Sequence, residues 1–245
     1  MTSDDTAPTA PRFLFLHGWE NFRPEGHWQH IAVTELRSRG YLVEYPQLPD
    51  ANTPTVAAWT DAVDAALTRL ATPDSPSAGD PYGARVTAPA PIVVVAHSLG
   101  SALWLAVRPG TTPVSRALLV AAPAPEVLLS FPEVAEFGAL LAERVAAVAG
   151  SRAGAGAGDA AGADSGVDPA ASPAPWAADN VILVGSDNDR FSPAGQRAHF
   201  GDAFGLETVV IPGGGHLDVT AGYGAWPSIV EWCVDPGSSI TARKP

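Results

Sequence analysis

The sequence contains very little cysteine: Cys233 is the only one among 245 residues. A single cysteine excludes a disulfide within the chain and a zinc site built from several thiolates. Basic side chains are also scarce, with 14 Lys and Arg against 26 Asp and Glu and a formal net charge of −12. Because this charge would repel a phosphate backbone, we expect no nucleic acid partner.

Long apolar runs are missing as well. No segment approaches the roughly 20 apolar residues that a membrane-spanning helix needs. The first residues, Met1–Asp5, include two acidic side chains and lack the basic and then apolar pattern of a secretion signal. We therefore expect a cytoplasmic protein without a membrane partner.

The composition is that of a globular chain, with 46% hydrophobic and 16% charged residues. Its length suits one α/β domain, and apolar runs typical of buried strands alternate with segments of helical spacing. The expected strands are 12–16, 41–45, 92–96, 116–122, 181–185 and 208–211, and the expected helices are 28–39, 55–70, 132–148, 193–204 and 226–234. This order predicts right-handed crossovers and a doubly wound, mainly parallel sheet with helices on both faces.

The domain itself is expected to span residues 12–235. Residues 1–11, rich in Thr, Ala, Pro and Asp, are predicted to form a disordered tail, and 236–245 a C-terminal tail. Two surface insertions are expected, at about 73–90 and 150–175. The second is a low-complexity run of Ala, Gly, Asp, Ser and Pro, which cannot bury enough surface to offset its ordering entropy.

One stretch, Ile92–Leu103, predicts a strand, a tight turn and a helix in immediate succession. Around Ser98 it matches the G-x-S-x-G nucleophile elbow, in which a serine hydroxyl stands above the sheet edge. Gly100 meets the requirement for a small residue two positions after the serine, whereas Ala96 replaces the usual first glycine. The alternative is an ordinary strand-to-helix turn in which Ser98 caps the helix.

A serine nucleophile needs a base, and the base needs an acid that orients it. His216 follows the last predicted strand on a glycine-rich loop and is the candidate base, although alone it would be interpreted as a surface histidine. Asp187 and Asp189 follow the preceding strand, so the order serine, aspartate, histidine is that of α/β-hydrolases. We favour Asp189 as the acid, because Asp187 is typical of a turn. All these positions follow strand ends, where ligands of parallel sheets bind.

Oxyanion donors are expected from the backbone N–H groups of Leu99 and of Trp19, which lies in the loop after the first strand. His97 is expected to pack or hydrogen-bond beside the elbow rather than to act as a base. His27 and His30 are spaced i, i+3 but have no evident third ligand, so no metal site is expected. Gly213–Gly215 lacks the Lys-Ser/Thr of a phosphate loop, and we expect no cofactor.

A series of short motifs follows along the chain: His17-Gly18-Trp19, His27-Trp28, Pro46-x-Leu48-Pro49, Val95–Gly100, Ser186–Asp189, Gly215–Leu217 and Gly222-Tyr223-Gly224-x-Trp226-Pro227. Together they resemble the retinoblastoma-binding-protein-9-type serine hydrolases over residues 12 to about 234. The resemblance implies an α/β-hydrolase fold without a large cap domain. It also implies Ser98, Asp189 and His216 as nucleophile, acid and base. Both insertions are longer than expected for that family, and Leu217-Asp218-Val219 replaces a more polar run.

The function expected from these residues is hydrolysis of a carboxylic ester, with an amide or thioester as alternatives, through an acyl-enzyme on Ser98. The partner would be a small-molecule ester or acyl substrate; the sequence identifies no protein partner. Two other functions stay open. The fold could serve a binding protein without turnover, since fold alone does not guarantee activity. The same residues could also transfer the acyl group to an alcohol or thiol.

Overall fold

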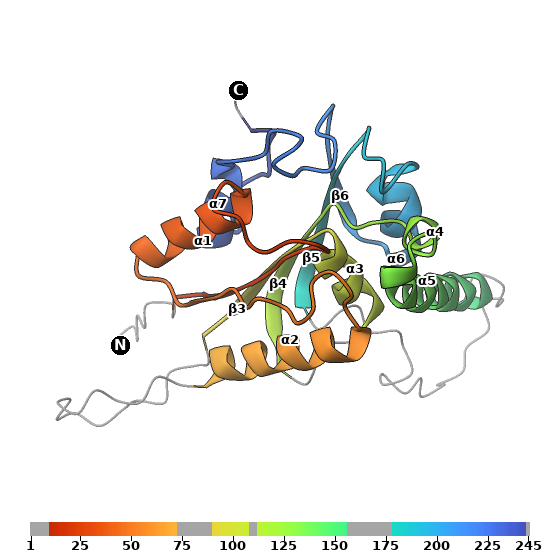
Figure 1. Cartoon of the computed structure of the whole chain (residues 1–245), viewed down its shortest axis with the longest axis horizontal. Helices are drawn as coiled ribbons and strands as arrows, with labels where there is room; N and C mark the ends of the chain where they lie inside the picture. The colour runs from red at the N-terminus through yellow and green to blue at the C-terminus, as the bar shows by residue number, and fades with distance from the viewer. Residues whose placement is uncertain (1–9, 73–89, 108–111, 156–177, 244–245) are drawn as a thin grey trace, which may run out of the picture.

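The computed structural model of the chain describes residues 10–72, 90–107, 112–155 and 178–243 (Figure 1). Most of both expected insertions and residues 1–9 of the predicted N-terminal tail lie outside these ranges. Within the described residues, no helix is long and apolar enough to cross a membrane.

A six-stranded sheet with the strand order β2-β1-β3-β4-β5-β6 forms the centre of the molecule. The strands are β1 (Arg12–Leu16), β2 (Val43–Glu44), β3 (Ile92–His97), β4 (Val114–Val120), β5 (Ala178–Ser186) and β6 (Glu207–Ile211). All five strand pairs are parallel, so the predicted sheet is confirmed. The carboxyl ends of the strands therefore share one edge, and the loops that leave this edge can meet.

Helices cover both faces of the sheet (Figure 1). Helices α1 (Trp28–Ser38) and α7 (Pro227–Val234) pack on one face, where a cluster of buried residues joins them to Phe13, Phe15 and Val93. The other face carries α2 (Val56–Ala71), α3 (Leu99–Ala106), α5 (Ala135–Ala155) and α6 (Asp202–Phe204).

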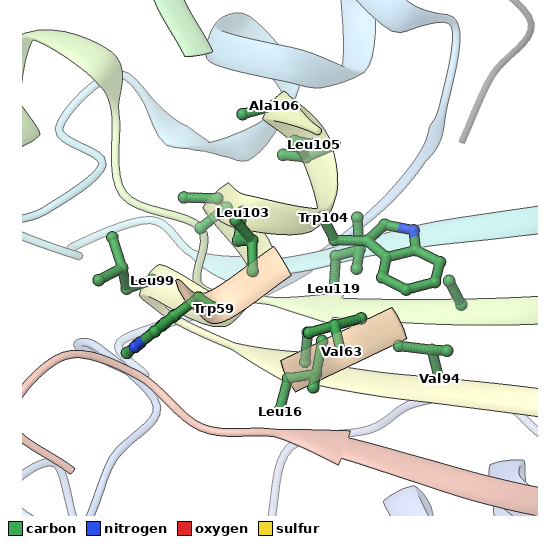
Figure 2. Packing of buried hydrophobic residues seen from close by; sticks show 14 of the residues in the cluster. Leu16, Trp59, Val63, Val94, Leu99, Leu103, Trp104, Leu105, Ala106 and Leu119 are labelled. Carbon is green, nitrogen blue, oxygen red and sulfur yellow. The ribbon is translucent and has the colours of Figure 1, made fainter. Parts of the chain in front are cut away.

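Two tryptophans belong to the cluster of buried residues on the face that carries α2 and α3. Trp59 on α2 and Trp104 on α3 are buried, and they lie among Leu16, Val63 and Val94 (Figure 2). This packing holds α3, and with it the turn at Ser98, against the sheet.

Several boundaries differ from the prediction. Strand β2 pairs only through Val43 and Glu44, and α5 continues to Ala155 although we expected its end at 148. The predicted helix 193–204 contains a π-helical turn, Arg197–Gly201, followed by the short α6, and Gly195 just before them has a φ of +81°, outside the helical region.

Two short elements follow β4. Helix α4 (Pro125–Leu128) is absent from the sequence prediction, and a 3₁₀ turn, Pro132–Val134, precedes α5. Farther along, the residues after α7 fold back on that helix: Ile240 is buried, and the Trp226 Nε1–H donates to the Thr241 carbonyl at 2.7 Å.

Candidate active site

Ser98 stands at the turn between β3 and α3 in a strained conformation, with φ +52° and ψ −123°. A positive φ is rare for a non-glycine residue and marks a backbone that its surroundings hold in place. The Ser98 N–H donates to the Val120 carbonyl at 2.9 Å. Two glycines let the neighbouring loop come close: a Cβ on Gly18 would lie 2.8 Å from the Ser98 Cβ, and one on Gly100 would lie 2.7 Å from the His17 carbonyl oxygen.

Three predicted site residues from three different loops meet at this turn. The His216 Nε2 lies 2.9 Å from the Ser98 Oγ, and its Nδ1 lies 2.9 Å from the Asp189 Oδ2. Asp189 is only 2% exposed, and its other oxygen accepts the Phe191 N–H at 2.9 Å. A carboxylate can only accept, so Nδ1 carries the proton of the neutral ring and Nε2 is free to accept from the serine hydroxyl.

Asp187, the alternative acid, occupies a different place. Its Oδ1 accepts the Gly213 N–H at 2.7 Å, and the Asn188 Oδ1 accepts the Gly215 N–H at 2.7 Å. The Ser186 hydroxyl donates to the Gly215 carbonyl. These three residues tie the loop after β6 to the loop after β5, while Asp189 reaches the histidine ring.

The backbone N–H groups of Trp19 and Leu99 flank Ser98 and have no hydrogen-bond partner within the described part of the chain. Leu99 is the first residue of α3, where helix N–H groups lack an intrahelical acceptor. Trp19 and Leu99 both line the same cavity as Ser98. Their N–H groups are the candidates for stabilising an oxyanion beside the serine.

His17 shapes the loop that carries Trp19, a function that the sequence did not indicate. Its Nδ1–H donates to the Gly18 carbonyl at 2.8 Å, and its Nε2 accepts the Leu48 N–H at 2.8 Å. Burial lowers the pKa of His17 to about 4, so the ring is neutral near pH 7. The only feature of the sequence that points to this role is the position of His17 directly after the first predicted strand.

A cavity of about 870 Å³ opens over Ser98. One wall is apolar and comes from Trp19 and the segment after β4; Trp19 and Phe131 rings lie 5.3 Å apart. The apolar residues of the lining are Trp19, Phe22, Pro24, Leu99, Pro123, Val127, Leu128, Phe131, Phe191 and Val219. Charged side chains are few there, namely Glu20, Arg190 and Asp218. The site therefore has room for an apolar group next to the serine.

Two more histidines lie beside His216. The His97 Nε2–H donates to the His216 carbonyl at 3.1 Å, which confirms that His97 hydrogen-bonds beside the elbow. His27 caps α1, accepting the Gln29 N–H on its Nδ1 at 3.2 Å. Both line the cavity, whereas His30 contacts the Arg23 carbonyl away from it. The i, i+3 spacing of His27 and His30 therefore reflects one helix cap and one surface contact.

Comparison with known proteins adds a family and a fold. A family model described as serine hydrolase matches residues 84–233. No curated protein matches the chain significantly. Among solved structures, the YdeN gene product from B. subtilis is 14% identical with a TM-score of 0.58, covering 91% of this chain and 96% of its own.

Two further solved structures are similar over most of their length. An esterase domain from a Rhodothermus marinus protein is 17% identical, has a TM-score of 0.54 and covers 94% of this chain and 88% of its own. A monoacylglycerol lipase from Paleococcus ferrophilus is 12% identical, with a TM-score of 0.54 and coverages of 93% and 96%. At these identities the likeness establishes the α/β-hydrolase fold.

Proposed function

The chain belongs to the serine hydrolase family, and we propose that it hydrolyses carboxylic esters through an acyl-enzyme on Ser98. The observation that carries the proposal is the continuous hydrogen-bonded series from the Ser98 hydroxyl through the His216 ring to the buried carboxylate of Asp189. A serine hydroxyl is a weak nucleophile until a base accepts its proton, and this series supplies the base and the group that orients it.

In the first half of the reaction the Ser98 Oγ attacks the ester carbonyl carbon, and the His216 Nε2 takes the hydroxyl proton. Asp189 stabilises the resulting imidazolium. The carbonyl oxygen becomes an oxyanion, which the N–H groups of Trp19 and Leu99 stabilise by about 2.7–4 kcal/mol each. Collapse of this intermediate breaks the bond to the alcohol oxygen, and the alcohol leaves with the proton from His216. An acyl group now occupies Ser98.

The second half uses water in place of the alcohol. His216 takes a proton from the water as its oxygen attacks the acyl carbonyl carbon, and it returns that proton to the Ser98 Oγ when the acid leaves. The apolar wall formed by Trp19, Val127 and Phe131 supports an apolar acyl group. An ester substrate also agrees with two structures of the same fold, described as an esterase domain and a monoacylglycerol lipase.

The test is labelling by a fluorophosphonate together with hydrolysis of p-nitrophenyl esters of increasing acyl length. We expect wild type to be labelled and Ser98→Ala to be neither labelled nor active, because the hydroxyl that contacts the His216 Nε2 is gone. Circular dichroism of Ser98→Ala checks that the fold is retained. Unchanged turnover in Ser98→Ala, or no labelling of folded wild type, would contradict the proposal. The second result would favour a binding protein.

A further inference from the structure

The apolar wall of the cavity over Ser98 packs on one face of the sheet. The rings of Trp19 and Phe131 in this wall lie against the core cluster under α2 and α3, and Leu99 and Leu128 belong to that cluster. All four residues line the cavity. An apolar group that enters the cavity is therefore expected to lie along this wall, over the face of the sheet that carries α2 and α3.

The cavity has a second side, formed by two loops that pack on the other face of the sheet. The loop after β1 contributes Glu20, and the loop after β6 contributes Asp218 and Thr220. These loops are joined where the Trp28 Nε1–H donates to the Leu217 carbonyl at 2.9 Å, and both of these residues belong to the core cluster under α1 and α7. Glu20, Asp218 and Thr220 thus form an acidic side opposite the apolar wall.

Both carboxylates of the acidic side have oxygens that a ligand can use. The Asp218 Oδ1 accepts the Thr220 hydroxyl at 2.7 Å and the Ala221 N–H at 2.9 Å, while its Oδ2 has no hydrogen-bond partner among the described residues. Burial opposes ionisation, but these two hydrogen bonds lower the pKa of Asp218, so the carboxylate is charged near pH 7. Glu20 is exposed.

Neither basic side chain nearest to the acidic side neutralises it. Arg23, on the same loop as Glu20, donates to the Tyr45 carbonyl at 2.6 Å and does not line the cavity. Arg190 lines the cavity on the loop after β5, where its guanidinium lies 4.6 Å from the centre of the Phe191 ring. Within the described part of the chain, the acidic side therefore forms no ion pair with Lys or Arg.

We propose that the acyl group of the substrate lies along the apolar wall and that its alcohol carries an ammonium group, which the carboxylates of Glu20 and Asp218 stabilise. The reaction favours this orientation. The alcohol oxygen takes its proton from His216, and Asp218 lies two residues farther along the same loop. The carbonyl oxygen faces the N–H groups of Trp19 and Leu99, which belong to the apolar wall. This inference rests on the proposed function, because it names the alcohol that leaves.

The remaining lining of the acidic side suits an alkylammonium group. Phe22 and Val219 also line this side and are 61% and 46% exposed, so methyl groups on the nitrogen have apolar contacts beside the charge. An exposed ion pair changes affinity by up to about 5-fold, and two carboxylates together are expected to give roughly 5- to 20-fold. The net charge of −12 also attracts a cation toward the molecule.

The first test compares three hexanoyl esters whose alcohols have the same length. The alcohols are 3-(dimethylamino)propan-1-ol, which is protonated near pH 7, its uncharged isostere 4-methylpentan-1-ol, and the anion 4-hydroxybutanoate. We expect kcat/KM of the cationic ester to exceed that of the uncharged ester by roughly 5- to 20-fold, and the anionic ester to react slowest. Added salt is expected to reduce the preference, because it screens exposed charges.

Equal kcat/KM values for the three esters, or fastest hydrolysis of the anionic one, would overturn the proposal. Glyceryl hexanoate is a fourth substrate, with hydroxyl donors and no charge. If it reacted faster than the cationic ester, the acidic side would recognise hydroxyl groups rather than an ammonium group, and the proposal would be wrong.

The second test removes one charge at a time. Asp218→Asn and Glu20→Gln are each expected to lower the ratio of kcat/KM for the cationic and uncharged esters by about 2- to 5-fold. The asparagine oxygen can still accept the bonds from Thr220 and Ala221, and the ratio cancels any change in His216 that affects both esters alike. Circular dichroism checks that each variant is folded.

Glu25→Gln is the matched control, because Glu25 lies on the same loop as Glu20 and outside the cavity lining. It removes the same charge and is expected to leave the ratio unchanged. An equal fall in the ratio for Glu25→Gln would assign the preference to net charge and overturn the proposed contact. So would an unchanged ratio in both folded Asp218→Asn and folded Glu20→Gln.

The third test moves the charge to the acid. It compares the 4-(dimethylamino)butanoyl and 5-methylhexanoyl esters of 4-methylpentan-1-ol, and we expect no preference for the cationic acyl group. A preference of 5-fold or more here would reverse the proposed orientation. Failure of the proposed function gives a different result, namely wild type that neither reacts with fluorophosphonate nor hydrolyses any of the esters. Wild type that is labelled and shows no preference for the cationic alcohol would overturn this inference alone.

Discussion

At the scale of single residues, Asp187 and Asp189 have the same side chain and different surroundings. The Asp189 carboxylate is buried against the His216 ring, whereas Asp187 is exposed and accepts a backbone N–H from Gly213. The sequence favoured Asp189 because Asp187 is typical of a turn. It could not show that Asp187 holds the loop of the base, because that contact joins residues 26 positions apart.

The two aspartates give a paired prediction. Asp189→Asn is expected to lower kcat on p-nitrophenyl esters by about 10⁴-fold, because an amide favours the wrong tautomer of the histidine and cannot stabilise the imidazolium. Asp187→Asn is expected to stay within a few-fold of wild type, because the amide oxygen can still accept the Gly213 N–H. The reverse order of effects would show that Asp187 is the orienting acid.

At the scale of elements, the turn between β3 and α3 depends on how closely β1 approaches it. A Cβ at Gly100 would lie 2.7 Å from the His17 carbonyl and 3.0 Å from the Leu16 carbonyl, and neither backbone oxygen can move without shifting the end of β1. The sequence predicted a small residue here from the motif. The structure identifies the atoms that require it.

Gly100→Ala is therefore expected to lower the free energy of unfolding by about 1–3 kcal/mol and to reduce esterase activity, since the loop bearing Trp19 moves with β1. Thermal unfolding and ester hydrolysis measure the two effects. Gly26→Ala is the control, because a Cβ there meets nothing within 4 Å. A Gly100→Ala protein as stable and active as Gly26→Ala would contradict the packing argument.

Elements that interact mainly with the sheet were predicted well, and short irregular ones were not. The apolar run of β3 and the amphipathic α2 carry periodicity over enough residues to be recognised. Helix α4 has four residues, Pro125–Leu128, which is too short for a period to appear. It nevertheless contributes Val127 and Leu128 to the cavity wall.

At the scale of the whole molecule, the fold buries several histidines in their neutral form. Burial lowers the pKa of His17 and of His27 to about 4 and lowers that of His97 well below its usual value, while the same groups titrate near 6.5 when unfolded. Below pH 6.5 the unfolded chain therefore binds protons that the folded chain does not. This proton binding stabilises the unfolded state, and increasingly so as the pH falls toward 4.

We expect the free energy of unfolding to be highest above pH 6.5 and to fall as the pH is lowered toward 4. The contribution is up to roughly 1.4 kcal/mol per pH unit for each buried histidine. Urea unfolding at pH 7, 6 and 5 measures the slope. His27→Gln is expected to make it shallower, because glutamine does not titrate. If the free energy of unfolding depended on pH in the same way in His27→Gln and in wild type, His27 would not contribute to this dependence.

By itself the sequence determined the parallel α/β sheet, the turn at Ser98 and the chain order serine, aspartate, histidine. These depend on the periodicity and turn chemistry of neighbouring residues. Only the tertiary structure decided which aspartate reaches the histidine and which segments form the wall of the cavity. It also brought the rings of His27, His97 and His216 next to one another in turn. The reason is physical: side-chain contacts between loops depend on the register and packing of the strands that carry them, and residues far apart in the chain meet only after the sheet has formed.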